Sequence, residues 1–336
     1  MKRKFKYLFS FLFTLVFLFL AFKDISLNEL ISSFKNVNIF WLAIFIFVGL
    51  ASHLLRAWRW KILLSAFKEN ISIKNTFGSV MIGYLINTAV PRLGELGRAF
   101  ILAKNEKLTT AATFGTVITE RLLDLAFFIL FIFTAILLLP SHFEKILPSI
   151  EQNKLLLNSI AILVLIKVLL IIFYPQLIRK IGNIIFKPLP KKISLPLEKL
   201  MEGVLSFHKI KNNTSKLIVI IQTVLIILLY TLSFEIAFKI FPNMNLENLG
   251  FEVAIVLMVA SGVAFTLPAP SGFGTYHSFI TYILATNYLI EKPIALSYAV
   301  ATHELGIILT AVIGCYYFFK FNISIKELKN NEAISN

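Results

Sequence analysis

Cysteine and charged residues are both scarce in this chain of 336 residues. The single cysteine, Cys315, lies in an apolar run, which excludes a disulfide framework and a cysteine metal site. Charged residues make up 15% of the sequence, less than a soluble domain of this size carries. The composition therefore indicates an integral membrane protein rather than a soluble domain.

Common enzyme signatures are also missing from the sequence. There is no P-loop, so we do not expect the chain to hydrolyse ATP. The stretch from Ser271 to Gly274 is no dinucleotide fingerprint, because no strand precedes it and the third glycine is absent. The histidines, at positions 53, 142, 208, 277 and 303, show no metal-ligand spacing. We therefore expect neither a cofactor nor a metal, and no catalytic residue.

Long apolar runs dominate what is present. Hydrophobic residues make up 57% of the chain, 33 residues are Phe, and the mean hydropathy is +0.81. Runs of about 20 apolar residues have the length that a helix needs to cross a bilayer. We predict an all-α, polytopic membrane protein with a single transmembrane domain over residues 1–336. Its six full spans are expected at 5–22, 39–55, 112–139, 154–174, 217–241 and 293–319.

Two further apolar segments are broken in the middle. The first runs from Thr76 to Leu102 and is interrupted over residues 87–95, which include Pro91 and Gly94. The second runs from Val253 to Leu289 and is interrupted over residues 267–274, which include Pro268 and Pro270. Such breaks leave backbone groups unpaired, so at membrane depth they are tolerated only inside protein or beside a wet cavity. We predict two re-entrant helical hairpins, and paired breaks of this kind indicate a transporter substrate site.

The distribution of lysine and arginine supports this layout. With the N-terminus in the cytoplasm, cytoplasmic stretches carry 25 of these residues and external stretches carry 6. Both termini are then cytoplasmic, in the cytoplasmic (inner) membrane of a bacterium. The net charge of +15 lies between spans, which argues against nucleic acid as a partner. The basic loop 175–216 is expected to lie on the cytoplasmic side and to contact anionic lipid headgroups.

The same layout gives the chain two related halves. Residues 5–139 and 154–319 each hold three spans and one hairpin in the same order. Because three is odd, the second half starts on the opposite side of the membrane. The first hairpin would then enter from the cytoplasm and the second from outside, which is an inverted repeat.

Ionisable residues gather near the breaks and in the spans that follow them. Each such group inside a bilayer is costly, so each is a candidate for function. Arginine suits phosphate because its planar fork binds two oxygens, and the glycines after the second break would let backbone N–H groups approach an anion. The predicted substrate-binding residues are Arg92, Glu95, Arg98, Glu120, Arg121, Asp124, Ser271, Gly272, Gly274, His277, His303 and Glu304.

Structural roles remain open for several of these residues. Arg121 with Glu120 or Asp124 is also interpretable as a buried pair that only holds helices together. Arg92 and Arg98 are equally compatible with snorkelling to the interface, and His303 with a hydrogen-bonded core histidine. The segment from Arg56 to Trp60 has the composition of an interfacial anchor, with arginines beside aromatic belt residues.

Four segments together resemble a known family. They are Leu55 to Trp60, Pro91 to Arg98, Glu120 to Asp124 and Pro268 to Gly274. The chain resembles, over about residues 5–320, the flippase-like membrane proteins (UPF0104-like) related to the transmembrane flippase domain of lysylphosphatidylglycerol synthases. The resemblance implies translocation of anionic or polyprenyl-linked lipids. It offers no counterpart of the soluble aminoacyl-transfer domain of those synthases, so we do not expect aminoacylation.

Our first hypothesis is a lipid flippase that binds a headgroup between the two hairpins. Arg92, Arg98 and Arg121 would meet phosphate, and the carboxylates, Glu304 among them, would orient arginines or carry a coupling proton. The second hypothesis is an enzyme that modifies a membrane lipid, with His303 and Glu304 as acid–base groups. The third is a non-catalytic subunit that recruits an envelope-synthesis enzyme through loop 175–216.

Overall fold

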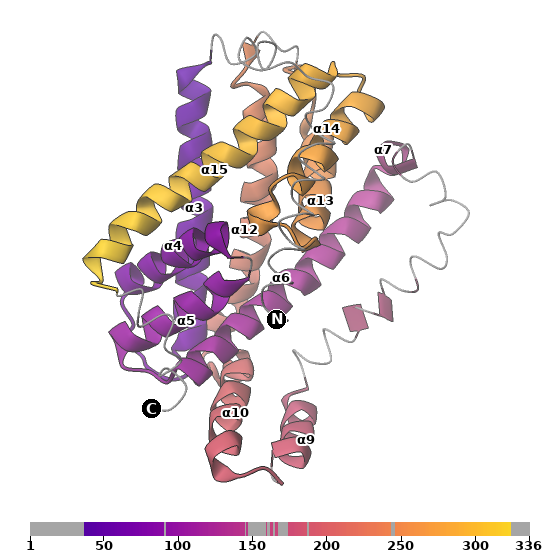
Figure 1. Ribbon diagram of the computed structural model, residues 1–336. Coiled ribbons are helices and arrows are strands. Elements are labelled where there is room, and N and C mark those ends of the chain that lie inside the picture. The colour runs from indigo at the N-terminus through magenta and orange to yellow at the C-terminus, as the bar shows by residue number, and fades with distance from the viewer. Residues whose placement is uncertain are drawn as a thin grey trace, which may run out of the picture.

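The computed structural model describes residues 37–90, 92–144, 174–186, 188–242 and 246–323, together with a few residues between 146 and 166. Within these ranges every regular element is a helix (Figure 1). The spans predicted at 5–22 and, for the most part, 154–174 lie outside the described residues. Pro91, predicted as a hairpin break, also lies outside them.

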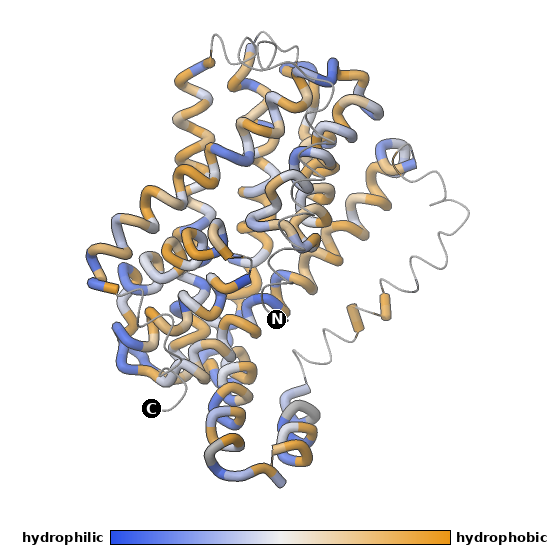
Figure 2. The backbone as a smooth tube through the Cα atoms, in the orientation of Figure 1, coloured by the Kyte–Doolittle hydropathy of each residue, from blue (hydrophilic) through white to orange (hydrophobic). Residues whose placement is uncertain are grey.

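Four long apolar helices have the length of a membrane span. They are α3 (Ile39–Leu64), α6 (Thr110–Leu138), α12 (Asn213–Phe238) and α15 (Lys292–Lys320). Figure 2 shows them as hydrophobic over most of their length. They confirm a polytopic helical membrane protein and correspond to the predicted spans 39–55, 112–139, 217–241 and 293–319. The first of these predictions was nine residues too short, since α3 continues through Arg56 and Arg59 to Leu64.

Two pairs of shorter helices correspond to the two broken segments. The first pair is α4 (Ile73–Ala89) and α5 (Leu93–Glu106), and the second is α13 (Phe251–Thr266) and α14 (Thr275–Asn287). The members of each pair pack against one another. In Figure 1, α4 and α5 lie in the lower part of the molecule and α13 and α14 in the upper part. In both halves of the chain, therefore, a short broken pair separates two long helices.

The breaks have local causes in the sequence. A residue that precedes proline is pushed towards extended backbone. Leu267 and Ala269 precede Pro268 and Pro270, and both are extended, with ψ of 152° and 136°. A short 3-10 turn, η2 (Pro270–Gly272), then leads into α14. The first break is shorter than predicted, because α4 continues to Ala89 and α5 begins at Leu93.

Non-glycine residues in left-handed backbone occur in both breaks. Arg92 has φ of 64° and Ser271 has φ of 45°. For an L-residue this conformation costs about 1–2 kcal/mol, so the surrounding contacts must hold it in place. Each break is thus a position where tertiary contacts determine the backbone.

The basic loop 175–216 contains three helices. They are α9 (Pro175–Phe186), α10 (Lys191–Val204) and α11 (Ser206–Lys209). At the crossing of α10 and α6, a Cβ added to Gly203 would lie 2.6 Å from the Cα atom of Gly115. Thr119 of α6 donates from its hydroxyl to the Val204 carbonyl at 2.9 Å. This close contact fixes α10 against the helix that carries Glu120 and Asp124.

The core of the described residues is divided into separate apolar clusters, of which two are named here. A large apolar cluster joins α12, α13, α14 and α15, with Leu257, Leu284 and Tyr298 fully buried. A smaller cluster joins α3, α4, α5 and α6 around Trp60 and Leu102.

Candidate functional site

A cavity of about 560 Å³ lies between the two breaks. Its wall comes from both halves of the chain, and the long helices α3, α6, α12 and α15 all contribute to it. Both charged and apolar side chains line it. Residues that line it and carry the argument below are Arg56, Arg92, Glu95, Arg121, Ser271 and His303.

Arg92 connects the first break to the second. Its Nη2 atom donates to the Thr266 carbonyl, at the end of α13, at 3.2 Å. The start of α5 is held in turn by Asn87, whose Oδ1 atom accepts from the Gly94 N–H at 2.7 Å. Gly94 is required there, because a Cβ would overlap the Gly83 carbonyl oxygen of α4. The two breaks therefore contact one another at the cavity wall.

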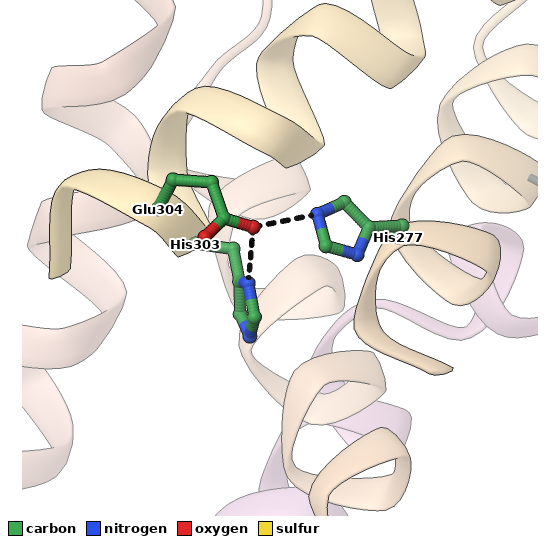
Figure 3. Close-up of side chains that lie close together, drawn as sticks. All are labelled: His277, His303 and Glu304. Atoms are coloured by element: carbon green, nitrogen blue, oxygen red, sulfur yellow. Dashed lines mark hydrogen bonds and ion pairs between the residues drawn. The ribbon is translucent and has the colours of Figure 1, made fainter. Parts of the chain in front are cut away.

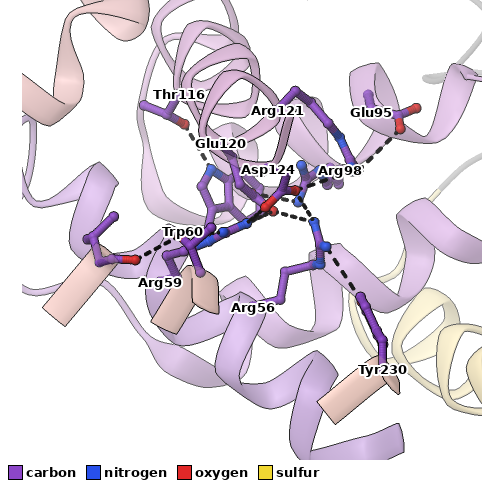
Figure 4. Close-up of polar contacts among 12 residues, drawn as sticks. Arg56, Arg59, Trp60, Glu95, Arg98, Thr116, Glu120, Arg121, Asp124 and Tyr230 are labelled. Atoms are coloured by element: carbon purple, nitrogen blue, oxygen red, sulfur yellow. Dashed lines mark hydrogen bonds and ion pairs between the residues drawn. The ribbon is translucent and has the colours of Figure 1, made fainter. Parts of the chain in front are cut away.

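Glu120 is the centre of a buried ion cluster (Figure 4). Its side chain is fully buried, and one carboxylate oxygen accepts from Arg56 at 2.7 Å and from Arg59 at 3.1 Å. Its other oxygen lies 3.1 Å from Nη1 of Arg98. A buried carboxylate needs such partners, since an isolated charge in the interior is strongly unfavourable.

Asp124 lies one helical turn from Glu120 and shares two of its partners. It contacts Arg59 at 2.6 Å and Arg56 at 3.0 Å. Arg121 lies on the cavity side of the cluster, with 43% of its side chain exposed, 3.4 Å from Glu95 and 3.6 Å from Asp124. The cluster thus extends from buried arginines with close carboxylate contacts to a loosely paired arginine at the cavity.

Positive charge exceeds negative charge around this cluster. Four arginines face three carboxylates, so one positive charge remains, and Arg92, which donates to the neutral Thr266 carbonyl, adds a second. Two arginines, Arg92 and Arg121, are exposed to the cavity, and the guanidinium group is chemically suited to contact an anion.

The interfacial-anchor interpretation of Arg56 to Trp60 was wrong for the arginines. Arg56 and Arg59 are 5% and 0% exposed and pair with carboxylates of α6. Trp60 is also buried; its indole N–H donates to Thr116 at 2.8 Å, and the guanidinium of Arg98 lies 4.8 Å from its ring centre. Snorkelling was likewise the wrong interpretation of Arg98, which is 3% exposed.

The second break carries a separate polar group made of His277, His303 and Glu304 (Figure 3). Oε1 of Glu304 lies 2.9 Å from Nδ1 of His303 and 3.2 Å from Nε2 of His277. The other nitrogen of His303 lies 2.8 Å from the Ser271 carbonyl oxygen. This group ties α14 and η2 to α15.

These three side chains are also the one place in the described residues where His, Cys, Asp and Glu gather as metal ligands do, with ligand atoms within 4.8 Å. A metal there would need the Nε2 lone pair of His277. The Gly274 N–H donates to Nδ1 of that ring at 3.3 Å, which leaves Nε2 to carry the proton in the neutral ring. The arrangement therefore suits hydrogen bonds to Glu304 better than a metal ion.

The predicted site residues fall into two groups. Arg92, Glu95, Arg121, Ser271, Gly272 and His303, together with Pro268, line the cavity. Arg98, Glu120, Asp124, Gly274, His277, Glu304 and the break residues Gly94 and Pro270 lie behind that lining, and most of them contact a residue in it. Arg121 does contact Asp124, but not as a buried pair that holds helices together, because both residues belong to α6 and 43% of the Arg121 side chain is exposed. Glu120 pairs instead with Arg56, Arg59 and Arg98.

Sequence reasoning missed the role of Arg56 and Arg59. A signal was available, because the two are three residues apart and so share one face of a helix, as Glu120 and Asp124 do. The polar lining supplied by Ser52, His53, Tyr84 and Tyr230 was also missed. Single hydroxyl and ring groups in apolar helices give no comparable signal.

One ion pair at the end of α5 lies outside the four long helices. Glu106 accepts from Lys68, from Asn75 at 2.8 Å and from the Ser72 N–H at 3.1 Å. Burial alone would raise the pKa of Glu106, but these hydrogen bonds outweigh it and lower the pKa below its usual value. They hold the end of the first broken pair against the loop between α3 and α4.

Comparison with known proteins gives two matches. A family model described as the lysylphosphatidylglycerol synthase TM region matches residues 7–314. A UPF0104 membrane protein of Methanocaldococcus jannaschii is 35% identical over 126 residues. That second match covers 36% of this chain and 36% of the relative, well under half of either. No solved structure matches the chain.

Proposed function

Because the chain belongs to the lysylphosphatidylglycerol synthase TM region family, we propose that it moves an anionic lipid, or a polyprenyl-linked one, between membrane leaflets. The headgroup would bind in the cavity between the two breaks. The observation that carries this proposal is the excess of positive charge at a cavity whose wall comes from both halves of the chain.

The charges favour an anionic headgroup. Arg121 is half-exposed at the cavity, and its contacts to Glu95 and Asp124 are the longest in the cluster, at 3.4 and 3.6 Å. A phosphate could replace these loose contacts with bidentate ones. Arg92 would meet the same phosphate from the first break. Glu120 then has a positioning role, because it holds Arg56, Arg59 and Arg98 behind the cavity wall.

The apolar part of the wall favours a lipid over a soluble anion. Phe45 and Gly49 of α3, Phe265 of α13 and Leu309 of α15 line the same cavity as the arginines. Binding sites for small molecules of drug size have volumes of about 300–1,000 Å³, so 560 Å³ accommodates a headgroup and the first part of its chain. A cavity with charged groups beside apolar side chains suits an amphiphilic ligand, which has a charged headgroup and an apolar chain.

The arrangement of the broken pairs supports alternating access. In the proposed topology, α4–α5 and α13–α14 are re-entrant hairpins that enter from opposite sides, as the inverted repeat of residues 5–139 and 154–319 requires. Both termini and helices α9 to α11 would face the cytoplasm, in the cytoplasmic membrane. Movement of one pair against the other would expose the headgroup to each leaflet in turn.

Exchange of labelled lipids in vesicles tests the proposal. The purified chain is reconstituted into liposomes, and leaflet exchange is measured for phosphatidylglycerol and for a short polyprenyl phosphate. The Arg121→Ala variant should lose exchange, since it removes one of the two arginines exposed to the cavity while Glu120 keeps Arg56, Arg59 and Arg98. The matched control is Arg179→Ala, at an exposed arginine of α9, which should exchange at the wild-type rate.

Two outcomes would contradict the proposal. If folded Arg121→Ala protein exchanged lipids at the wild-type rate, the proposed role of that arginine would be contradicted. Absence of exchange for both lipids with folded wild-type protein would contradict the flippase function itself. Chemical analysis of the lipids recovered from the same vesicles tests the enzyme hypothesis, which predicts a changed lipid because His303 lines the cavity beside Glu304.

A further inference from the structure

The hydrogen-bond partners of His303 determine which of its two ring nitrogens carry a hydrogen. Its Nε2 atom is 2.8 Å from the carbonyl oxygen of Ser271, and a carbonyl can only accept. Nε2 must therefore carry a hydrogen. In a neutral imidazole the other nitrogen, Nδ1, then has only a lone pair.

The second nitrogen meets another acceptor. Nδ1 of His303 lies 2.9 Å from Oε1 of Glu304. A lone pair facing an ionised carboxylate at this distance would be repulsive, so a hydrogen must lie between the two atoms. Either the ring is an imidazolium beside a carboxylate, or a neutral ring accepts from a protonated carboxyl. In both cases the pair contains one proton more than a neutral histidine and an ionised glutamate would.

We propose that His303 and Glu304 form a proton-binding site, and that the bound proton holds the second break against α15. The claim that this pair binds a proton rests only on the geometry of His303, Glu304 and Ser271. The further claim that the proton is coupled to lipid transport rests on the proposed function.

His277 completes the site as a neutral partner. Its Nδ1 atom accepts from the Gly274 N–H at 3.3 Å, so its Nε2–H is directed at Glu304, 3.2 Å away. The carboxylate oxygen is thus contacted by two ring nitrogens. Around the pair, α14 also presents Tyr276, whose ring stacks on His303 at 4.9 Å and whose hydroxyl pairs with Thr302. The titratable groups across the cavity are His53, Arg56, Tyr84, Arg92, Glu95, Arg121 and Tyr230.

The two members of the pair face different surroundings. His303 lines the cavity, and its side chain is 2% exposed. Glu304 is not among the cavity-lining residues, and 32% of its side chain is exposed. In the proposal, the proton reaches Glu304 through its exposed side and not through the cavity that would hold the lipid.

Loss of the proton would change the second break. A neutral ring protonated at Nδ1 keeps its bond to Glu304 but presents a lone pair to the Ser271 carbonyl, 2.8 Å away. A ring protonated at Nε2 keeps Ser271 but repels Glu304. Ser271 has φ of 45°, which is unfavourable for an L-residue, so the loss of this contact would release its backbone. Because Ser271 lines the cavity, deprotonation would reshape the proposed binding site.

Nuclear magnetic resonance of the histidine rings tests the site without any transport assay. The full chain is labelled with ¹⁵N at its histidines, and His303→Gln identifies the signals of His303 among the five residues. We expect either two protonated nitrogens on His303, or one together with a protonated Glu304 carboxyl in the infrared spectrum. Raising the pH should remove this proton. A neutral His303 beside an ionised Glu304 at neutral pH would overturn the proposal.

The same labelled sample tests whether this site binds a metal ion instead of a proton. Zinc is added to the labelled protein, and the signals of His277 and His303 are followed. If the site binds a proton, we expect the ring signals of His277 and His303 to stay unchanged at one equivalent of zinc. Saturation of both rings at one equivalent, absent in His303→Gln, would replace the proton site with a metal site.

Vesicles with a pH gradient test the coupling separately. The gradient should change the rate of leaflet exchange in wild-type protein, and Glu304→Gln should lose that response. The matched control is Glu235→Gln in α12, whose carboxylate is paired with Lys239 at 3.7 Å and should leave the response intact. A wild-type response in Glu304→Gln would overturn the coupling role. Absence of any exchange in wild-type vesicles contradicts the proposed function instead, and the ring measurements still decide the proton site.

Discussion

The guanidinium of Arg92 donates to the carbonyl oxygen of Thr266 at 3.2 Å, although 174 residues separate them in the sequence. Arg92 belongs to the break between α4 and α5, and Thr266 is the last residue of α13. The bond therefore joins the two broken segments across the cavity wall. It is exposed, so its net strength is modest and it can open and close.

Arg92→Gly tests this link. Glycine tolerates the left-handed backbone, with φ of 64°, that arginine occupies there, and the relief of about 1 kcal/mol offsets the lost hydrogen bond. We expect slower lipid exchange with the free energy of unfolding unchanged within about 1 kcal/mol. Exchange is measured in vesicles and stability by denaturant unfolding in detergent. A wild-type exchange rate would show that the link between the breaks has no role in transport.

Glu120→Ala should destabilise the fold strongly. The substitution leaves Arg56, Arg59 and Arg98 buried around a missing partner, and the removal of one member of a buried ion pair costs about 3–5 kcal/mol. Thermal unfolding in detergent measures the loss. The control is Glu202→Ala, because that carboxylate is 55% exposed beside Lys209 and such a surface pair contributes about 0–1 kcal/mol. Equal losses in the two variants would contradict the central role of Glu120.

Gly203→Ala should separate α10 from α6. The new Cβ would overlap the Ala112 carbonyl oxygen and lie 2.6 Å from the Cα atom of Gly115. Overpacking of this kind costs about 1–3 kcal/mol. The control is Gly306→Ala in α15, where no atom lies within 4 Å of the added Cβ and the better helix propensity should stabilise by up to about 1 kcal/mol. Unfolding curves should therefore shift in opposite directions.

Glu106 makes the stability depend on pH in the acid range. Its pKa is lowered in the folded state, so the protein gains stability from it above the unfolded pKa of about 4.3 and loses that gain as the pH falls through the folded pKa. Glu106→Gln should be less stable than wild type at pH 7, and the difference should shrink below about pH 4. Unfolding curves of both proteins across this range measure it. A constant difference at all pH values would contradict the assignment.

The positions of the helices and breaks could be predicted from local rules. Pro268 and Pro270 force extended backbone at the residues before them, and the lengths of the apolar runs identify the four long helices. Helix ends were less accurate. The end of α3 was missed because Arg56 and Arg59 resemble interface residues until their partners on α6 are known.

The site could be predicted in its residues but not in its pairings. Arg121, Ser271 and His303 follow from the cost of polar groups in apolar segments, and the structure places all three at the cavity. Which arginine meets which carboxylate depends on how α3, α5 and α6 cross, which the sequence pattern does not contain. Arg98 illustrates this, because its place beneath Trp60 depends on contacts between three helices.

The cavity wall includes Phe45 of α3 and Thr310 of α15, from opposite ends of the described chain. A molecule seated there binds the folded protein and has no comparable site on the unfolded chain. By mass action, a ligand present at 100 times its dissociation constant then adds about 2.7 kcal/mol to the free energy of unfolding. Candidate lipids can therefore be ranked by how far each raises the melting temperature of the protein. The largest increase identifies the headgroup that binds most tightly at equal concentration.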